Sequence, residues 1–182
     1  MEKGADPNLL GETRDDGTIS CLTHACTTNN SAMAELLLKH GADPNLLDDP
    51  DQCSPLVQAC HPKGLPVMKL LLAYGADVNS SLPGYGTALN CACQIGSLDM
   101  ARLLLDAGAD VNLVDGQGDT PLIVICRDGE DEAQVALIQF LLEHGADPAI
   151  PGEDGRTALD YVAEGSEIAQ MIAQAQLEPI LK

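Results

Sequence analysis

The feature that most constrains the fold is a short string repeated along the whole chain. Gly-Ala-Asp recurs every 33 to 37 residues, starting at Gly4, Gly41, Gly75, Gly108 and Gly145. A second string, Ser/Thr-x-Leu, recurs at nearly the same period, starting at Ser20, Ser54, Thr87, Thr120 and Thr157. Two linked landmarks with a period of this length indicate a solenoid of stacked units, not a domain built around one closed core.

Each unit is predicted to contain two helices. Ser54-Pro55 and Thr120-Pro121 place a hydroxyl at a helix N-cap and a proline at the first helical position, where no backbone N–H is needed. A second helix then runs through a leucine-rich stretch, as over 97–106, and ends at the glycine of Gly-Ala-Asp, which can adopt a left-handed conformation. Turn-forming residues follow. Each unit therefore reads as helix, turn, helix and a projecting hairpin loop, which we call a finger.

This unit resembles the ankyrin repeat. Thr120-Pro121-Leu122 and Gly108-Ala109-Asp110-Val111-Asn112 match the family strings T-P-L and G-A-D-V-N, and five linked copies cover nearly the whole chain. The resemblance implies an all-α solenoid of about five helix-turn-helix units with projecting β-hairpin loops. We expect a single domain over 1–182, and a longer parent protein, since the chain opens on the last residues of a unit. The expected units are a remnant with a long finger over 1–19, repeats over 20–53, 54–86, 87–119 and 120–156, and a C-terminal capping repeat over 157–182.

One departure from the family concerns how repeats are held together. The family has a histidine in T-P-L-H that ties neighbouring repeats by hydrogen bonds, and this chain replaces it in every unit. We therefore expect packing or other polar contacts to hold the stack. The replacing residues are Thr23, Val57, Asn90, Ile123 and Asp160.

The chain is strongly acidic, with 9 Lys+Arg against 28 Asp+Glu and a net charge of −19. This charge argues against unaided binding to nucleic acid or an anionic membrane, because both require cationic side chains. Four extra residues fall between the helices of the fourth unit, around an acidic run at 127–132. With the fingers, this run concentrates carboxylates, so we expect a protein or peptide partner that is basic or neutral.

The seven cysteines indicate reduced thiols in an intracellular protein, cytoplasmic or nuclear. Four of them stand where the ankyrin pattern has a small residue that lets helices pack closely. No cofactor or metal is predicted, because the acidic run at 48–51 lacks the rest of a calcium loop. A monomer is expected unless the truncated N-terminal face pairs. The four packing cysteines are Cys26, Cys60, Cys93 and Cys126.

The resemblance also predicts where a partner binds. In ankyrin repeats the fingers and first helices line a concave face, and partner contacts usually come from there. Tyr85 is the single aromatic residue on a finger, so we expect it to be an anchor. The candidate partner-binding residues are Arg14, Asp51, Gln52, Tyr85, Gln117, Asp119, Arg156, His61, Gln94, Ile95 and Arg127.

No motif pairs a nucleophile with a base, so we predict a non-catalytic interaction scaffold. Three alternatives remain open. The chain could be the substrate-recruiting segment of a longer multidomain enzyme, or an enzyme that uses His61 and nearby carboxylates in its groove. It could also be an enzyme's substrate, because the segments ending in Asn79 and Asn112 resemble the Leu-x5-Asp-Val-Asn sites at which asparagine hydroxylases modify ankyrin repeats.

Overall fold

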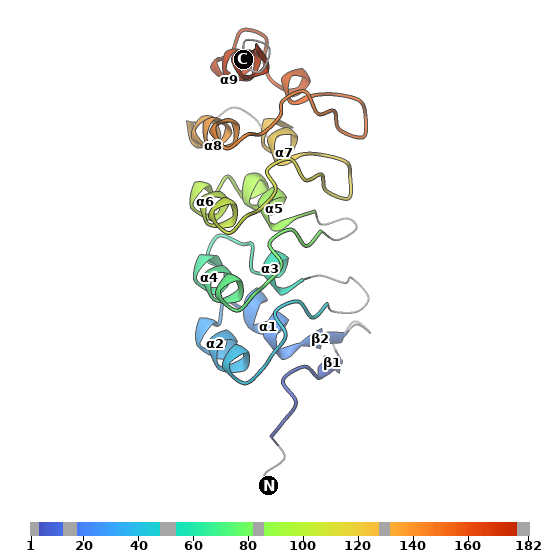
Figure 1. Ribbon diagram of the computed structural model, residues 1–182, viewed down its shortest axis with the longest axis vertical. Helices are drawn as coiled ribbons and strands as arrows, with labels where there is room; N and C mark the ends of the chain where they lie inside the picture. The colour runs from blue at the N-terminus through green and yellow to red at the C-terminus, as the bar shows by residue number, and fades with distance from the viewer. Residues whose placement is uncertain (1–3, 13–17, 48–53, 82–85, 128–131, 178–182) are drawn as a thin grey trace.

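The computed structural model describes residues 4–12, 18–47, 54–81, 86–127 and 132–177. Its helices stack in two columns along the long axis of the molecule, with the two termini at opposite ends (Figure 1). The first helices of successive units are α1 (Cys21–Thr27), α3 (Pro55–Gln58), α5 (Ala88–Ile95), α7 (Pro121–Arg127) and the 3-10 helix η1 (Ala158–Tyr161). The second helices are α2 (Ser31–Lys39), α4 (Leu65–Ala73), α6 (Leu98–Asp106), α8 (Glu132–Glu143) and α9 (Glu167–Leu177). The predicted all-α solenoid is confirmed.

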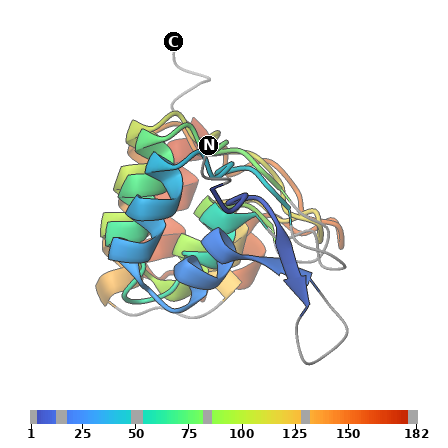
Figure 2. The ribbon, with the colours of Figure 1, turned by 90° about the horizontal axis from the view of Figure 1, so that it is seen from below.

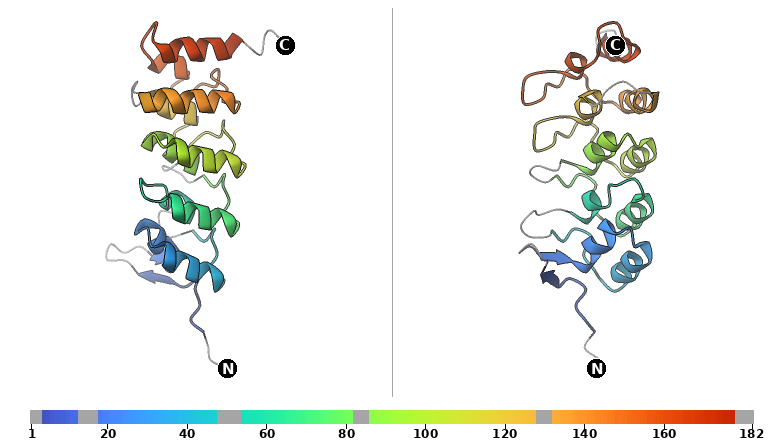
Figure 3. Two further views of the ribbon diagram at one scale, coloured as in Figure 1. Left: turned by 90° about the vertical axis from the view of Figure 1, so that its left-hand side faces the viewer. Right: turned by 180° about the vertical axis from the view of Figure 1, so that it is seen from behind.

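The second helices form parallel rows down one side of the stack, and the fingers project from the other side (Figures 2 and 3). The first finger contains a regular hairpin, in which β1 (Leu10–Glu12) pairs antiparallel with β2 (Thr18–Ser20). We call the surface formed by the fingers and by α1, α3, α5, α7 and η1 the finger face.

The predicted helix boundaries follow from local chemistry. The Ser54 hydroxyl accepts the Val57 N–H at 3.3 Å, and the Thr120 hydroxyl accepts the Ile123 N–H at 3.3 Å, which confirms both N-caps. The glycines that end four second helices have φ angles between 86° and 91°, in the left-handed region. Because side chains disfavour that region, glycine sets the point at which each helix stops.

The core is a continuous column of apolar side chains between the two rows of helices. Leu71 and Leu104, at equivalent positions of α4 and α6, are fully buried. Cys26, Cys93 and Cys126 are at most 2% exposed, as expected for small packing residues. No disulfide joins the cysteines in the described ranges, and no helix there is long and apolar enough to cross a membrane.

Asparagine side chains of the Gly-Ala-Asp strings and their neighbours join successive repeats. Asn45 Nδ2 donates to the Gly75 carbonyl at 3.1 Å, and its Oδ1 accepts the Asp77 N–H at 2.8 Å. The same two bonds recur from Asn8, Asn79 and Asn112, so one amide bridges each pair of neighbouring turns. We call these bridges the asparagine ladder.

Asn90 replaces the family histidine most directly. It stands at the histidine position of the third repeat, and its Nδ2 donates to the Asp119 carbonyl of the next finger at 3.1 Å. Packing and other polar contacts therefore hold the stack, as expected.

Two expectations about the helices are wrong in detail. The ankyrin pattern places Cys60 and His61 on the first helix of their unit, but α3 ends at Gln58 and both residues lie beyond it. His61 precedes Pro62, and a residue before proline is disfavoured in helical conformation, which accounts for the early end.

The second correction concerns the insertion at 127–132. α8 has 12 residues where α2, α4 and α6 each have nine, so much of the extra length extends a helix. Residues 128–131 of this acidic run lie outside the described residues.

Candidate functional site

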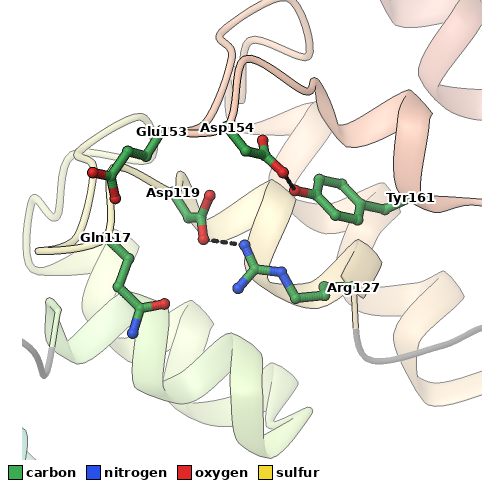
Figure 4. Close-up of a pocket in the computed structure, with 6 residues that line it drawn as sticks. All are labelled: Gln117, Asp119, Arg127, Glu153, Asp154 and Tyr161. Carbon is green, nitrogen blue, oxygen red and sulfur yellow. Dashed lines mark hydrogen bonds and ion pairs between the residues drawn. The ribbon is translucent and has the colours of Figure 1, made fainter.

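A cleft of about 490 Å³ opens on the finger face, between the fingers that precede α7 and η1 (Figure 4). One wall comes from the finger before α7, the other from the finger before η1, and the two helices supply side chains that face both walls. We call it the finger cleft. Its lining residues are Gln117, Asp119, Arg127, Glu153, Asp154 and Tyr161.

Asp115 builds the first wall. Its Oδ1 accepts the N–H groups of Gln117 at 2.8 Å and Asp119 at 3.0 Å, and its own N–H donates to the Asp119 carbonyl at 3.0 Å. These bonds close a tight turn, a common use of aspartate. The turn leaves Gln117 exposed, while Asp119 is only 3% exposed.

The second wall is closed in the same way. Gly152 N–H donates to the Arg156 carbonyl at 2.8 Å, and Asp154 Oδ1 accepts the Arg156 N–H at 2.9 Å. Gly152 lies close against the first wall, because a Cβ there would lie 2.4 Å from Asp119 Oδ1 and would have to displace that carboxylate. The absence of a side chain therefore lets the two fingers touch at the Asp119 carboxylate.

An ion pair ties the first wall to the helix behind it. Arg127, the last residue of α7, donates from Nη2 to Asp119 Oδ2. The hydrogen bond to Asp119 raises the pKa of Arg127 above its already high value, so the guanidinium stays charged. Its Cζ lies 5.4 Å from the centroid of the Tyr161 ring, within the range of a cation–π contact.

Tyr161 is in turn held by the second wall. Its hydroxyl donates to Asp154 Oδ2 at 2.7 Å. This bond lowers the pKa of Asp154, assisted by the Arg156 N–H, and raises the pKa of Tyr161. At neutral pH the pair is therefore a carboxylate and a neutral phenol.

Two groups in the finger cleft are left available for a ligand. The Asp119–Arg127 and Asp154–Tyr161 pairs are drawn in Figure 4, with Glu153 and Gln117 outside both. Among the described residues, neither the Glu153 carboxylate nor the Gln117 side-chain amide has a hydrogen-bond or ion-pair partner. Three carboxylates against one guanidinium make the lining acidic, so these groups suit a donor that carries positive charge.

The structure brings three of the candidate binding residues together. Gln117, Asp119 and Arg127 line the finger cleft, and Arg156 lies beside it, with its Cζ 5.8 Å from the Tyr161 ring centroid. The other candidates within the described ranges are His61, Gln94 and Ile95, and those outside them are Arg14, Asp51, Gln52 and Tyr85.

The candidates outside the finger cleft, His61, Gln94 and Ile95, lie elsewhere on the stack. Gln94 and Ile95 are exposed in the last turn of α5. The His61 Nε2 lies 3.1 Å from the Cys26 carbonyl, a hydrogen bond between the first and second repeats. His61 thus has a structural contact, and it does not line the finger cleft.

Sequence reasoning missed Tyr161 and Asp154 as parts of this site. Tyr161 stands four residues after Thr157, the offset that places His24 four residues after Ser20 on α1. That alignment assigns Tyr161 to the finger face and was the signal available. It could not reveal the partners of Tyr161, because they depend on the turn of the last finger.

Asn79 and Asn112, the candidate hydroxylation sites, both belong to the asparagine ladder. Asn112 Nδ2 donates to the Gly145 carbonyl at 3.0 Å, and Oδ1 accepts the Asp147 N–H at 2.8 Å. Their modification stays a prediction. Among the residues with described positions, no group of three or more His, Cys, Asp or Glu side chains could hold a metal ion.

Stacked helix pairs with projecting fingers define a helical repeat protein of the kind that presents one long surface. The chain belongs to the ankyrin repeat family: the family pattern of three consecutive ankyrin repeats matches residues 1–82, 22–115 and 89–181. Ankyrin repeats are generally non-catalytic modules for protein–protein interaction.

Several curated proteins are similar to the chain. It is 40% identical over 116 residues to ankyrin repeat and SOCS box protein 11 of Danio rerio, covering 63% of this chain and 37% of that protein. It is 38% identical over 170 residues to ankyrin repeat and SOCS box protein 6 of Mus musculus, covering 82% of this chain and 40% of that protein. The putative ankyrin repeat protein YahD of Escherichia coli is 31% identical over 162 residues, covering 86% of this chain and 79% of YahD. The chain thus spans about two fifths of the first two relatives.

Proposed function

We propose that this protein is a non-catalytic scaffold that binds a basic protein or peptide on its finger face, with the finger cleft as a central contact. The observation that carries the proposal is the arrangement of the cleft. Two internal pairs, Asp119–Arg127 and Asp154–Tyr161, fix its walls, while the Glu153 carboxylate and the Gln117 amide remain unengaged. Fixed walls with a few open polar groups are typical of a preformed binding site.

The protonation behaviour of the cleft favours binding over acid–base catalysis. A general base works best when its pKa lies near the operating pH. The hydrogen bond from Tyr161 lowers the pKa of Asp154, which moves it further from neutral pH. The Asp119 carboxylate is occupied by Arg127. These two acidic groups therefore serve as charged structural acceptors.

The charge of the chain favours a basic partner. A net charge of −19 attracts cationic molecules over distances set by the ionic strength, and complementary charge mainly increases the association rate. Glu153 then offers a contact for one Lys or Arg side chain at the cleft.

A defined cationic probe tests the proposal. Hexa-arginine should bind the protein, and the affinity measured by titration calorimetry should fall as salt rises. Glu153→Gln should weaken binding about two- to fivefold, the size of an exposed charge pair. The matched control is Glu143→Gln on α8, away from the fingers, which should weaken it less. Equal losses from both variants, or binding that does not depend on salt, would overturn the proposal.

The names of the relatives favour a second reading, in which this chain recruits a substrate for a longer assembly. The ankyrin repeat and SOCS box proteins carry, by name, an element in addition to the repeats, and the chain spans 37% and 40% of two of them. A reading frame containing both parts would support this role, and the finger face would then bind the recruited protein.

A further inference from the structure

The finger cleft contains one carboxylate that has no cationic partner among the described residues. The Asp119 carboxylate is paired with Arg127, and Asp154 Oδ2 lies 3.8 Å from the Nε of Arg156. Glu153 is the third carboxylate of the lining, and no ion pair of the described residues includes it. The charge of the lining therefore favours the uptake of one cationic side chain.

Glu153 is held next to Gln117, although the two residues come from different fingers. Gly118 follows Gln117, and a Cβ at Gly118 would lie 3.1 Å from both the Cβ and the backbone nitrogen of Glu153. The φ of Gly118 is 76°, so glycine allows both this backbone conformation and the close approach. Figure 4 shows the Gln117 and Glu153 side chains on the same side of the finger cleft, away from Tyr161. Both residues are exposed, so one ligand group can reach them together.

The two open side chains offer hydrogen-bond acceptors on adjacent fingers. Glu153 supplies its carboxylate oxygens, and Gln117 supplies its amide oxygen. A guanidinium is planar and carries five N–H donors, so it can place two of them on a carboxylate and still donate to a neighbouring amide oxygen. A lysine ammonium is a compact, strongly hydrated point charge that lacks this fork of donors. The arrangement of the acceptors therefore favours arginine.

A guanidinium of the protein itself is already held in the finger cleft by a carboxylate and a second contact. Arg127 donates to the Asp119 carboxylate, and its Cζ lies 5.4 Å from the centroid of the Tyr161 ring. This pairing occupies the Tyr161 side of the cleft and offsets the charge of Arg127. An arginine that arrives from outside is therefore directed to the side formed by Glu153 and Gln117.

We propose that the finger cleft accepts a single arginine side chain of the partner in preference to lysine, with the Glu153 carboxylate and the Gln117 amide oxygen as its acceptors. The inference rests on the proposed function, because it names the residue type through which the basic partner is recognised. One consequence is sensitivity to arginine methylation. Dimethylation of one terminal nitrogen keeps the positive charge but blocks two-point hydrogen bonding, so the methylated side chain should bind no better than lysine.

Titration calorimetry with peptides of equal charge tests the inference. The peptides are hexa-arginine, hexalysine and hexa-arginine with asymmetrically dimethylated side chains. The wild-type protein should bind hexa-arginine about two- to fivefold more tightly than the other two, the gain from one net hydrogen bond at an exposed site. Gln117→Met keeps the length of the side chain but removes the acceptor, and should bring the affinities toward equality. The matched control is Gln94→Met at an exposed position of α5 outside the cleft, which should leave the preference unchanged.

NMR spectra of the isotope-labelled wild-type protein supply a readout that does not depend on variants. The side-chain NH2 signals of Gln117 should shift when hexa-arginine is added, because the amide oxygen then accepts a hydrogen bond. They should shift much less with hexalysine or with the methylated peptide. Equal shifts of these signals with all peptides would contradict the role of the Gln117 amide.

The outcomes separate this inference from the proposed function. Equal, salt-dependent affinities for hexa-arginine and hexalysine would overturn the arginine preference and leave the proposed function standing. A preference that persists in Gln117→Met would also overturn the inference, because the discrimination would then come from another part of the surface. If no peptide binds, the proposed function fails, and the arginine preference fails with it.

Discussion

Asp119 and Arg127 form an ion pair in which the two partners are unequally exposed. The Asp119 side chain is 5% exposed and the Arg127 side chain 41%. The pair ties the finger before α7 to the end of that helix, and the same carboxylate lies against Gly152 of the next finger. One buried acidic group therefore connects three segments of the finger face.

This asymmetry predicts different costs for the two halves of the pair. Arg127→Met leaves a buried carboxylate without its partner and should destabilise the protein by about 3 kcal/mol. Asp119→Asn leaves a half-exposed guanidinium that water can solvate, and should cost about 1 kcal/mol. Urea unfolding of the two variants measures both values. A larger loss from Asp119→Asn would show that the carboxylate is not the buried member.

The Tyr161–Asp154 hydrogen bond predicts a pH dependence at both ends of the scale. Because the pKa of Tyr161 is raised, its contribution to stability is present below pH 10.0 and is lost as pH rises through the raised value. The pKa of Asp154 is lowered from 3.8, so its contribution is present above that pH and is lost as pH falls through the lowered value.

Asp154→Ala tests this dependence. It should lower the pKa of Tyr161 toward its ordinary value, since the acceptor that holds the phenol proton is removed. Titration of ring-labelled tyrosines by NMR follows the change. Identical Tyr161 curves in the wild type and the variant would rule out the hydrogen bond in solution.

The stack predicts that a leucine-to-alanine substitution costs more on the buried face of a second helix than on the exposed face. Leu71 on α4 is fully buried, and Leu71→Ala should cost about 2–5 kcal/mol. Leu36 on α2 is 53% exposed, so Leu36→Ala should cost less than about 1 kcal/mol. Chemical denaturation compares them directly. Similar losses would contradict the assignment of the buried helix faces.

The asparagine ladder predicts that one amide supports two repeats. Asn112→Ala removes a donor to Gly145 and an acceptor for Asp147, and should cost about 1–3 kcal/mol. The control is Ala149→Asn, at the equivalent position where the ladder ends, which should change stability by less than about 0.5 kcal/mol. Thermal unfolding of both variants distinguishes a bridging role from a local one, in which Asn112→Ala would be as neutral as the control.

The repeat period was sufficient to predict the fold, because each landmark has a local cause. The hydroxyl of Ser54 caps its helix, and Gly75 ends the next one by adopting a positive φ. The shortened α3 was missed because the family pattern outweighed a local rule about the residue before Pro62.

The finger cleft could be predicted only in part. Gln117, Asp119 and Arg127 follow from their positions in the repeat. Their relation to Tyr161 depends on the close approach of two fingers at Gly152, which is a tertiary contact between neighbouring units. Periodicity assigns residues to a face, but it does not determine which of them pair.

The most direct test of the proposed binding role is NMR mapping of hexa-arginine on the isotope-labelled protein, with hexaglutamate as the control. The account predicts that hexa-arginine shifts the backbone signals of Gln117, Glu153 and their neighbours on the finger face, and that hexaglutamate does not. The shifts should shrink as salt rises. Shifts centred on α2, α4, α6 and α8, or equal responses to both peptides, would contradict the claim that the finger face binds a basic partner.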